Sequence, residues 1–247
     1  MRTLAIVTDS FPDDPALDTA VSRAVLERVG AGELPETLRL ARPGPMVAFA
    51  KQDAVAGGYA AAVRAARERG FEAILRLAGG RAAVFHEGTL ELAHAIPDPD
   101  PRPGIHERFE WSAGLIARAL GRLGVDARVG AVPGEYCPGG YSVNLRGEVK
   151  IAGIGQRLIK GAAHVGAVVV AEGGGRIAEV LVPVYGALGL DFDPTTAGEV
   201  GVCLDDVVSA VRAEYAERFE LVESSIDEAT LALAQRLRSD HLAPDAY

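Results

Sequence analysis

The sequence predicts an α+β domain in which helices flank a largely antiparallel mixed sheet. Three observations lead to this class. Hydrophobic residues make up 49% of the 247-residue chain, enough to bury a substantial core. Short strand-like segments joined by turns dominate the middle of the chain, and segments with helical periodicity stand toward both ends. There is no internal repeat or low-complexity linker, so we expect a single domain over residues 1–247, with a helical C-terminal part from about residue 204.

The first elements are a helix and a pair of strands. Residues 17–29 predict an amphipathic helix, because apolar side chains recur every four positions and Gly30 follows as a stop. Residues 37–40 and 46–50 predict two strands. The turn-forming residues 43–45 stand between them, so the pattern indicates a hairpin.

The next segments alternate between helix and strand. An alanine-rich helix over residues 57–69 is expected to lead into a strand at 72–77, which ends in glycines. Residues 82–96 contain further strand-like sequence, followed by a proline-rich loop. A stripe of apolar residues over 105–123 predicts a long core helix that Gly124 ends.

The second half of the chain changes from strands to helices. Strands come first, with a turn at Arg146 and Gly147 between two of them, so hairpins are expected there. The predicted elements are strands at residues 125–132, 142–145, 148–154 and 163–171, and helices that begin near 204 and span 226–237.

Charge and hydropathy exclude several classes of protein. A net charge of -9 argues against a nucleic-acid partner, which requires a basic surface. Every uninterrupted apolar run is shorter than the roughly 18 to 20 residues of a membrane-spanning helix, so no membrane association is expected. The N-terminal apolar run lacks the length and cleavage site of a signal peptide, so we expect a cytoplasmic protein. Basic residues outnumber acidic ones over 128–160, either as a local positive site or by chance.

The chain contains two cysteines, which cannot form a disulfide framework and make no recognisable metal site with the five histidines. Cys203 stands in an apolar run before a helix, so we expect a buried, unreactive thiol there. Cys137 lies between Tyr136 and Pro138 in an irregular, glycine-rich loop and is expected to be accessible. A thiol is only a few per cent thiolate at neutral pH, and the ammonium of Lys150, across the next hairpin, could favour the reactive form. The alternative is that Cys137 only fills space.

Two further segments are rich in glycine. Residues 76–80 place the paired Gly79 and Gly80 at a strand end, where the backbone can approach a ligand closely, although glycine pairs are also common in ordinary turns. Residues 150–157 carry glycines inside a predicted strand, which suggests that something packs against the backbone there. An acyl chain would suit, since burial of eight carbons offers roughly 5 kcal/mol. A bulge or a crowded sheet crossing is the alternative.

Together these segments resemble the lipoate-protein ligase and lipoyl/octanoyl transferase family, whose catalytic domain is similar in fold to that of biotin-protein ligases. The resemblance covers about residues 18–171. The family's Arg-x-Ser-Gly-Gly strand end corresponds to residues 76–80, and its Lys-x-x-Gly-x-x-Gln-Arg strand corresponds to residues 150–157. The branch that takes octanoyl from the glycine-cleavage H protein is the most similar, because residues 136–139 match its Tyr-Cys-Pro-Gly loop.

The resemblance implies roles for particular residues. Cys137 is implied as the nucleophile and Lys150 as the group that contacts the acyl carbonyl. The residues implied in substrate binding are Arg76, Gly79, Gly80, His86, Gly153, Gln156, Arg157 and His164. The sequence departs from the family pattern at Ala78, where serine is usual, at His86, where this branch has aspartate, and at Leu158, where a second arginine is common. These departures put one ligand hydrogen bond in doubt and leave the role of His86 open, including a purely structural one.

The implied activity is transfer of an octanoyl or lipoyl group through a thioester on the cysteine to a lysine of a lipoyl domain, with no cofactor required. Implied partners are the H protein and the lipoyl domains of 2-oxoacid dehydrogenase E2 subunits, with acyl-carrier protein as an alternative donor. Two other functions remain open. One is an ATP-dependent lipoate-protein ligase, although the residues beyond 171 leave little room for its usual accessory domain. The other is a non-catalytic module that binds acyl groups or carriers.

Overall fold

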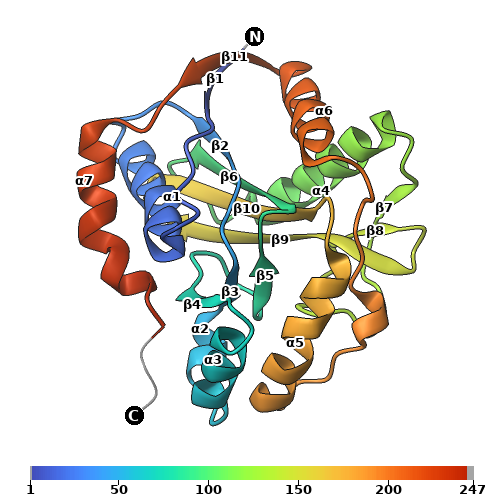
Figure 1. The fold of residues 1–247 in the computed structure, drawn as a ribbon. Helices are drawn as coiled ribbons and strands as arrows, with labels where there is room; N and C mark the ends of the chain where they lie inside the picture. Colours follow the sequence, from blue (N-terminus) through green and yellow to red (C-terminus); the bar gives the residue numbers. More distant parts are fainter. Residues whose placement is uncertain (1, 244–247) are drawn as a thin grey trace.

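The computed structural model describes residues 2–243, which form two sheets surrounded by helices (Figure 1). In spatial order, the strands of the larger sheet are β11 (Phe219–Ser224), β1 (Arg2–Val7), β2 (Thr37–Ala41), β6 (Thr89–Pro97), β10 (Ala162–Val170), β9 (Val149–Ile159), β8 (Val143–Leu145) and β7 (Ala127–Val129). Strand β1 is parallel to both of its neighbours, and the other pairings in this sheet are antiparallel. The smaller sheet contains β4 (Glu72–Leu75), β3 (Met46–Phe49) and β5 (Ala83–Phe85).

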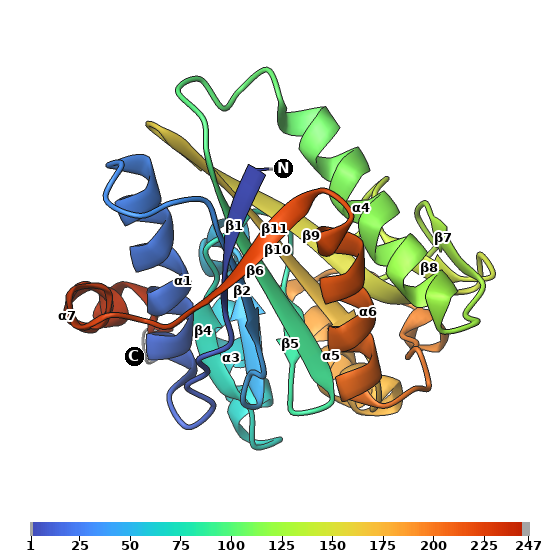
Figure 2. The same ribbon diagram turned by 90° about the horizontal axis from the view of Figure 1, so that it is seen from above.

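Helices cover both faces of the larger sheet (Figure 2). The helices are α1 (Pro15–Gly30), α2 (Lys51–Ala54), α3 (Tyr59–Arg67), α4 (Ile105–Arg122), α5 (Gly174–Leu188), α6 (Leu204–Ala216) and α7 (Glu228–Leu237). Helices α4 and α6 pack on one face, where their apolar residues meet those of β1, β2, β6 and β10 in the main core. Helices α1 and α7 pack together beside the sheet, while α3 and α5 share a second core with the smaller sheet.

Local sequence signals explain where several helices begin and end. The Asp14 side chain accepts a hydrogen bond from the Leu17 N–H at 3.1 Å, and Pro15 occupies the first turn of α1, where its missing donor costs nothing. Helix α4 is followed by Gly124, whose φ of 78° is a left-handed conformation that glycine adopts readily. The predicted fold class is confirmed: helices flank a large, mostly antiparallel sheet.

The predicted hairpin at residues 37–50 is wrong. Strand β2 pairs with β1 and β6, whereas β3 lies in the smaller sheet between β4 and β5, so both edges of both strands are occupied by other partners. The segment between them crosses from the larger sheet to the smaller one and packs closely on the loop that precedes α1. A Cβ atom at Gly44 would lie only 1.9 Å from the carbonyl oxygen of Pro12.

Several elements were absent from the sequence prediction, among them the short helix α2, the helix α5 and two strands. Helix α5 follows a run of glycines and contains Pro183, and both features are typical of loops. Strands β1 and β11 pair with each other in parallel although they stand at opposite ends of the chain. The part of the chain beyond residue 204 is therefore not only helical, because β11 forms an edge of the main sheet. Within residues 2–243, the structure has no helix of the length and apolarity needed to cross a membrane.

Candidate active site

Cys137 lies in the loop between β7 and β8, and its backbone is left-handed, with a φ of 42°. This conformation is uncommon for a residue with a side chain and persists only when neighbouring groups enforce it. Tyr185 of α5 is such a neighbour. Its hydroxyl accepts a hydrogen bond from the Cys137 N–H at 2.8 Å and donates one to the carbonyl of Ala82 at 2.9 Å. One buried side chain therefore ties the cysteine loop to the loop between β4 and β5.

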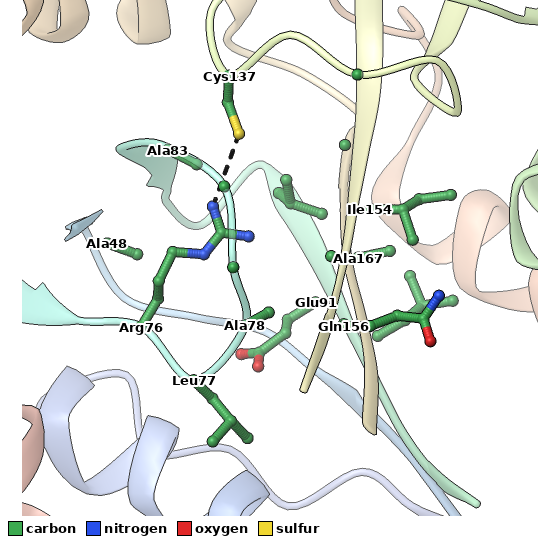
Figure 3. A pocket seen from close by; sticks show the side chains of 18 of the residues that line it. Ala48, Arg76, Leu77, Ala78, Ala83, Glu91, Cys137, Ile154, Gln156 and Ala167 are labelled. Carbon is green, nitrogen blue, oxygen red and sulfur yellow. Dashed lines mark hydrogen bonds between the residues drawn. The ribbon is translucent and has the colours of Figure 1, made fainter. Parts of the chain in front are cut away.

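The thiol points at that second loop (Figure 3). Its Sγ accepts a hydrogen bond from the backbone N–H of Arg81 at 3.1 Å and lies 4.0 Å from Nη1 of Arg76. The same nitrogen of Arg76 donates to the Arg81 carbonyl at 2.9 Å, which fixes the guanidinium beside the sulfur. Gly80 makes this approach possible, because a Cβ there would lie 2.8 Å from Sγ. The sulfur thus sits where one amide dipole and one cation can stabilise negative charge.

Lys150 of β9 is buried, with 2% of its surface exposed. Its Nζ donates to the carbonyls of Tyr136 at 2.9 Å and Cys137 at 2.8 Å, and lies 4.8 Å from the centre of the Tyr136 ring. Burial lowers the pKa of Lys150, while the neighbouring Cys137 and Glu135 oppose this shift. The ammonium therefore braces the backbone of the cysteine loop, and the cation in contact with the sulfur is Arg76, which was predicted for substrate binding only.

Glu135 organises the same loop from within. Its Oε1 accepts hydrogen bonds from the Gly139 N–H at 3.0 Å and the Ser142 hydroxyl at 2.8 Å, while Oε2 lies 3.7 Å from Nζ of Lys150. A buried carboxylate is costly unless it is paired and hydrogen-bonded, and here it has both kinds of partner. Sequence reasoning missed Glu135 and Tyr185. Glu135 was visible as the acid next to the loop, whereas no local signal connects Tyr185 with it.

A cavity of about 420 Å³ opens beside the thiol, between the two sheets. Cys137 and Lys150 form part of its wall, and small residues of β9 and β10 form its floor. Glycine is needed there: a Cβ at Gly155 would lie 3.0 Å from both Ala78 Cβ and Arg76 Nη2, and a Cβ at Gly166 would lie 2.7 Å from Nε2 of His164. The glycines keep the floor of the cavity open, and the volume is in the range of small-molecule sites.

Most of the predicted site residues line this one cavity. They are Arg76, Gly79, Gly80, Cys137, Lys150, Gly153, Gln156 and His164. Burial lowers the pKa of His164 to about 3, with His94 and Arg76 acting in the same direction, so its ring is neutral near pH 7. Gln156 accepts from Nε of Arg108 at 3.0 Å and donates to the carbonyl of Ile105 at 2.8 Å, which joins the cavity rim to α4.

His86 and Arg157 do not line the cavity. His86 is buried in the turn between β5 and β6, where Nδ1 accepts from the Gly88 N–H at 3.0 Å and the ring packs against Gly173. Arg157 is exposed on β9. Ala78, at the position where serine is usual, contributes only a methyl group to the wall.

The second cysteine is the reverse of what the sequence suggested. Cys203 is exposed, so the prediction of a buried thiol is wrong. It is the N-cap residue that precedes the first residue of α6. The apolar side chains of α6 are buried, whereas this thiol stays at the surface. Cys203 therefore provides a natural control for experiments on Cys137.

The fold, the loop-borne thiol and the adjoining cavity together define a catalytic domain of the lipoate-protein ligase type. Residues 14–182 match the model of the lipoyl protein ligase A/B catalytic domain. The chain belongs to this family, which confirms the resemblance read from the sequence.

Two relatives illustrate the range of named activities. The octanoyl-[GcvH]:protein N-octanoyltransferase of Geobacillus kaustophilus is 30% identical over 230 residues, which cover 93% of this chain and 76% of that protein. The lipoyl-[GcvH]:protein N-lipoyltransferase of Listeria monocytogenes is 28% identical over 160 residues, which cover 63% of this chain and 57% of that protein.

Solved structures agree on the fold. A lipoate-protein ligase A bound with ATP superposes with a TM-score of 0.77 at 19% identity, covering 97% of this chain and 95% of that one. A bi-partite lipoate protein ligase from Thermoplasma acidophilum, studied with its E2 lipoyl domain, has a TM-score of 0.69 at 19% identity, with 97% and 92% coverage.

Proposed function

We propose that this protein transfers an octanoyl or lipoyl group from a carrier protein to a lysine of a lipoyl domain, through a thioester on Cys137. The observation that carries the proposal is the position of the Cys137 sulfur at the wall of the cavity, held between the Arg81 N–H and the Arg76 guanidinium. A nucleophilic thiol needs a nearby positive charge or dipole and access to its substrate, and this sulfur has both.

The reaction has two balanced halves. In the first, the sulfur attacks the acyl carbonyl of the donor, a C–S bond forms, the bond to the donor's nitrogen breaks, and the thiol proton leaves with the donor amine. In the second, the acceptor lysine's amine attacks the thioester, the C–S bond breaks and the thiol is restored. No nucleotide takes part, because one amide bond is broken and another is formed, so the overall transfer is close to neutral in free energy, and the less stable thioester is consumed in the second half.

Lys150 is suited to hold the acyl carbonyl. An ammonium has three donors, and two of them bond the carbonyls of Tyr136 and Cys137. Lys150 also lines the cavity, and we propose that its third donor bonds the acyl oxygen once the acyl group is bound. A donor fixed before the reaction, in a place with little water, stabilises the charge that develops on that oxygen. Arg76 contributes to activation of the thiol through its position beside the sulfur, and Lys150, whose pKa burial lowers and the neighbouring Cys137 raises, contributes electrostatically.

The proposed partners follow from the names of the two relatives. Both names contain GcvH, which is the H protein, so we propose an acylated H protein as the donor. The proposed acceptors are lipoyl domains, including those of E2 subunits. No cofactor is required in this scheme, and a cytoplasmic location would place the protein beside these partners.

The test is intact-mass analysis of the protein mixed with octanoylated or lipoylated H protein in the absence of ATP. The expected result is one acyl adduct on the wild type that hydroxylamine removes. Cys137→Ser should lose the adduct and the transfer, while Cys203→Ser, which alters the exposed thiol, should retain both. Transfer by Cys137→Ser that depends on ATP would identify a ligase. Absence of transfer by every variant, with or without ATP, would identify a binding module.

A further inference from the structure

The cavity has a polar end that the acyl-transfer chemistry does not use. Glu91 of β6 lines the cavity and stands directly opposite Val168 of β10, which in turn stands opposite Gly153 of β9. A Cβ at Gly153 would lie 3.3 Å from Cε of Lys150, so Gly153 marks the catalytic end. In Figure 3 the Glu91 carboxyl lies in the lower part of the cavity, away from Cys137, with Arg76 between them in the view.

The distance across the sheet matches the length of the acyl chain. Neighbouring strands lie about 4.8 Å apart, so two strand spacings separate Gly153 from Glu91 by about 10 Å. An extended chain advances about 3.3 to 3.6 Å for every three bonds, so the seven carbon–carbon bonds of an eight-carbon acyl group span about 8 Å. An extended eight-carbon chain that starts at the Lys150 end of the cavity and crosses β10 is therefore long enough to reach Glu91.

Among residues 2–243, Glu91 forms no ion pair. Arg39, whose charge lowers the pKa of Glu91, is fully buried and donates to the Asp18 carboxylate, to the hydroxyl of Ser22 at 3.0 Å and to the carbonyls of Asp18 and Asp9. The Ser22 hydroxyl in turn donates one long hydrogen bond to Oε1 of Glu91, at 3.5 Å. Oε2 of Glu91 is buried without a hydrogen-bond partner among residues 2–243.

The surroundings raise the population of the neutral acid. Burial, and then the carboxylate of Asp18, raise the pKa of Glu91 to about 7 against the effect of Arg39, so near pH 7 the neutral acid is about as abundant as the carboxylate. The other titratable groups of the cavity do not pair with it: the ring of His164 is neutral, and Arg76 is bonded beside the thiol. A carboxylic acid in this state presents an O–H donor to the distal end of the chain.

An unpaired buried polar group costs free energy that a suitable ligand atom can recover. The methyl end of an octanoyl group offers nothing to the acid. A lipoyl group ends in a disulfide ring, whose sulfur atoms are polarisable weak acceptors. We propose that Glu91 determines the acyl specificity of this cavity and selects an eight-carbon acyl group with sulfur at its distal end, a lipoyl group, over octanoyl. The inference rests on the proposed function, since it assumes that the acyl chain occupies this cavity.

The experiment is a competition. Wild type, Glu91→Leu and Glu91→Gln are mixed with equal amounts of lipoylated and octanoylated H protein, and intact mass gives the initial ratio of the two acyl-enzymes. Wild type should favour lipoyl. Glu91→Leu should lower the lipoyl-to-octanoyl ratio about tenfold, equivalent to about 1.4 kcal/mol, while Glu91→Gln, which keeps a donor at the same place, should stay close to the wild-type ratio.

A wild type that favours octanoyl, or a ratio that Glu91→Leu leaves unchanged, overturns the inference. Because a ratio is measured within one sample, a partly unfolded variant does not distort it, and the wild-type preference decides the matter if Glu91→Leu does not fold. Failure of the proposed function has a different signature, which is no adduct with either group. Calorimetric affinities of the wild type for free lipoate and octanoate then provide the comparison, and equal affinities would reject a selective role for Glu91.

Discussion

Two cations are buried near the cavity, and they are used in different ways. Arg39 on β2 has no exposed surface, and its N–H groups donate to the Asp18 carboxylate, the Ser22 hydroxyl and two backbone carbonyls. Lys150 on β9 is equally hidden, but it bonds two carbonyls and lies 3.7 Å from its nearest carboxylate, beyond hydrogen-bond distance.

The difference separates a structural cation from a catalytic one. The planar guanidinium has a fixed fork of donors, and its partners here match that fork, so Arg39 holds α1 against β2. Lys150 lines the cavity beside Cys137, and burial lowers its pKa. A buried cation that lines a cavity and has no carboxylate within hydrogen-bond distance is therefore the better candidate for a catalytic role.

The largest expected effect is on folding stability at the structural cation. Arg39→Met removes the partner of the buried Asp18 carboxylate and should lower the free energy of unfolding by about 3 to 5 kcal/mol. Urea denaturation measures this loss. Arg39→Met combined with Asp18→Asn should recover part of it, because no unpaired charge is left. If the single variant is as stable as the wild type, Arg39 has no structural role.

At the catalytic cation, the effect should be on rate. Lys150→Ala should slow acylation of Cys137 by about 10² to 10³ in single-turnover mass spectrometry, as loss of one preorganised donor does elsewhere. Lys150 is also buried against Glu135, so the melting temperature should fall as well.

The double variant Lys150→Ala/Glu135→Gln separates the two effects at this site. It should restore part of the melting temperature, since the buried carboxylate is neutralised, and leave acylation slow. Acylation at the wild-type rate by either variant would show that Lys150 has no catalytic role and that the comparison of the two cations misassigns it.

A smaller effect is expected at the tyrosine that holds the cysteine loop. Tyr185→Phe removes the hydroxyl between the Cys137 N–H and the Ala82 carbonyl, and one such hydrogen bond contributes about 0.5 to 1.5 kcal/mol. Acylation should slow several-fold with a modest fall in melting temperature. The matched control is Tyr215→Phe, whose hydroxyl faces His94 in the main core. Equal effects of the two substitutions on acylation would mean that Tyr185 has no specific role in positioning.

The smallest effect is a dependence of stability on pH. Burial lowers the pKa of His164 to about 3, whereas a histidine of the unfolded chain titrates near 6.5. As the pH falls below 6.5, the unfolded chain binds the proton and the folded one does not, so stability decreases, by less than about 1 kcal/mol at pH 6 from this group. His164→Asn should flatten this part of the curve of unfolding free energy against pH. An unchanged slope would show that His164 is not held neutral.

Much of the candidate site could be predicted from the sequence, but the interactions that determine its energetics could not. The proline and glycines around Cys137 predicted an accessible loop because those residues restrict the backbone locally, and the structure places this thiol beside a cavity. The burial of Lys150 depends on Glu135 and on a sheet that closes over both, which no local pattern encodes. The guanidinium of Arg76 reaches the sulfur only after β4 and the cysteine loop have been brought together.

The errors in the fold have the same origin. Residues 43–45 form a turn by composition, but which strand edges meet depends on partners far along the chain, so the expected hairpin proved to be a crossover between sheets. Strand β11 pairs with β1 across nearly the whole sequence. Glu91 illustrates the limit at the site: a carboxyl on a strand is typical of a solvated face, and only the second sheet turns that face into a cavity wall.

The central claim is that an acyl group on Cys137 lies on the path to the acceptor, and the most direct test isolates that species. The protein is acylated with octanoylated H protein in the absence of ATP, freed of donor by rapid gel filtration, and mixed with a lipoyl domain. We predict that the acyl group moves from Cys137 to the domain's lysine in one turnover, at least as fast as the overall reaction with donor present. An isolated acyl-enzyme that keeps its acyl group, or passes it on more slowly than the complete reaction proceeds, would contradict the account.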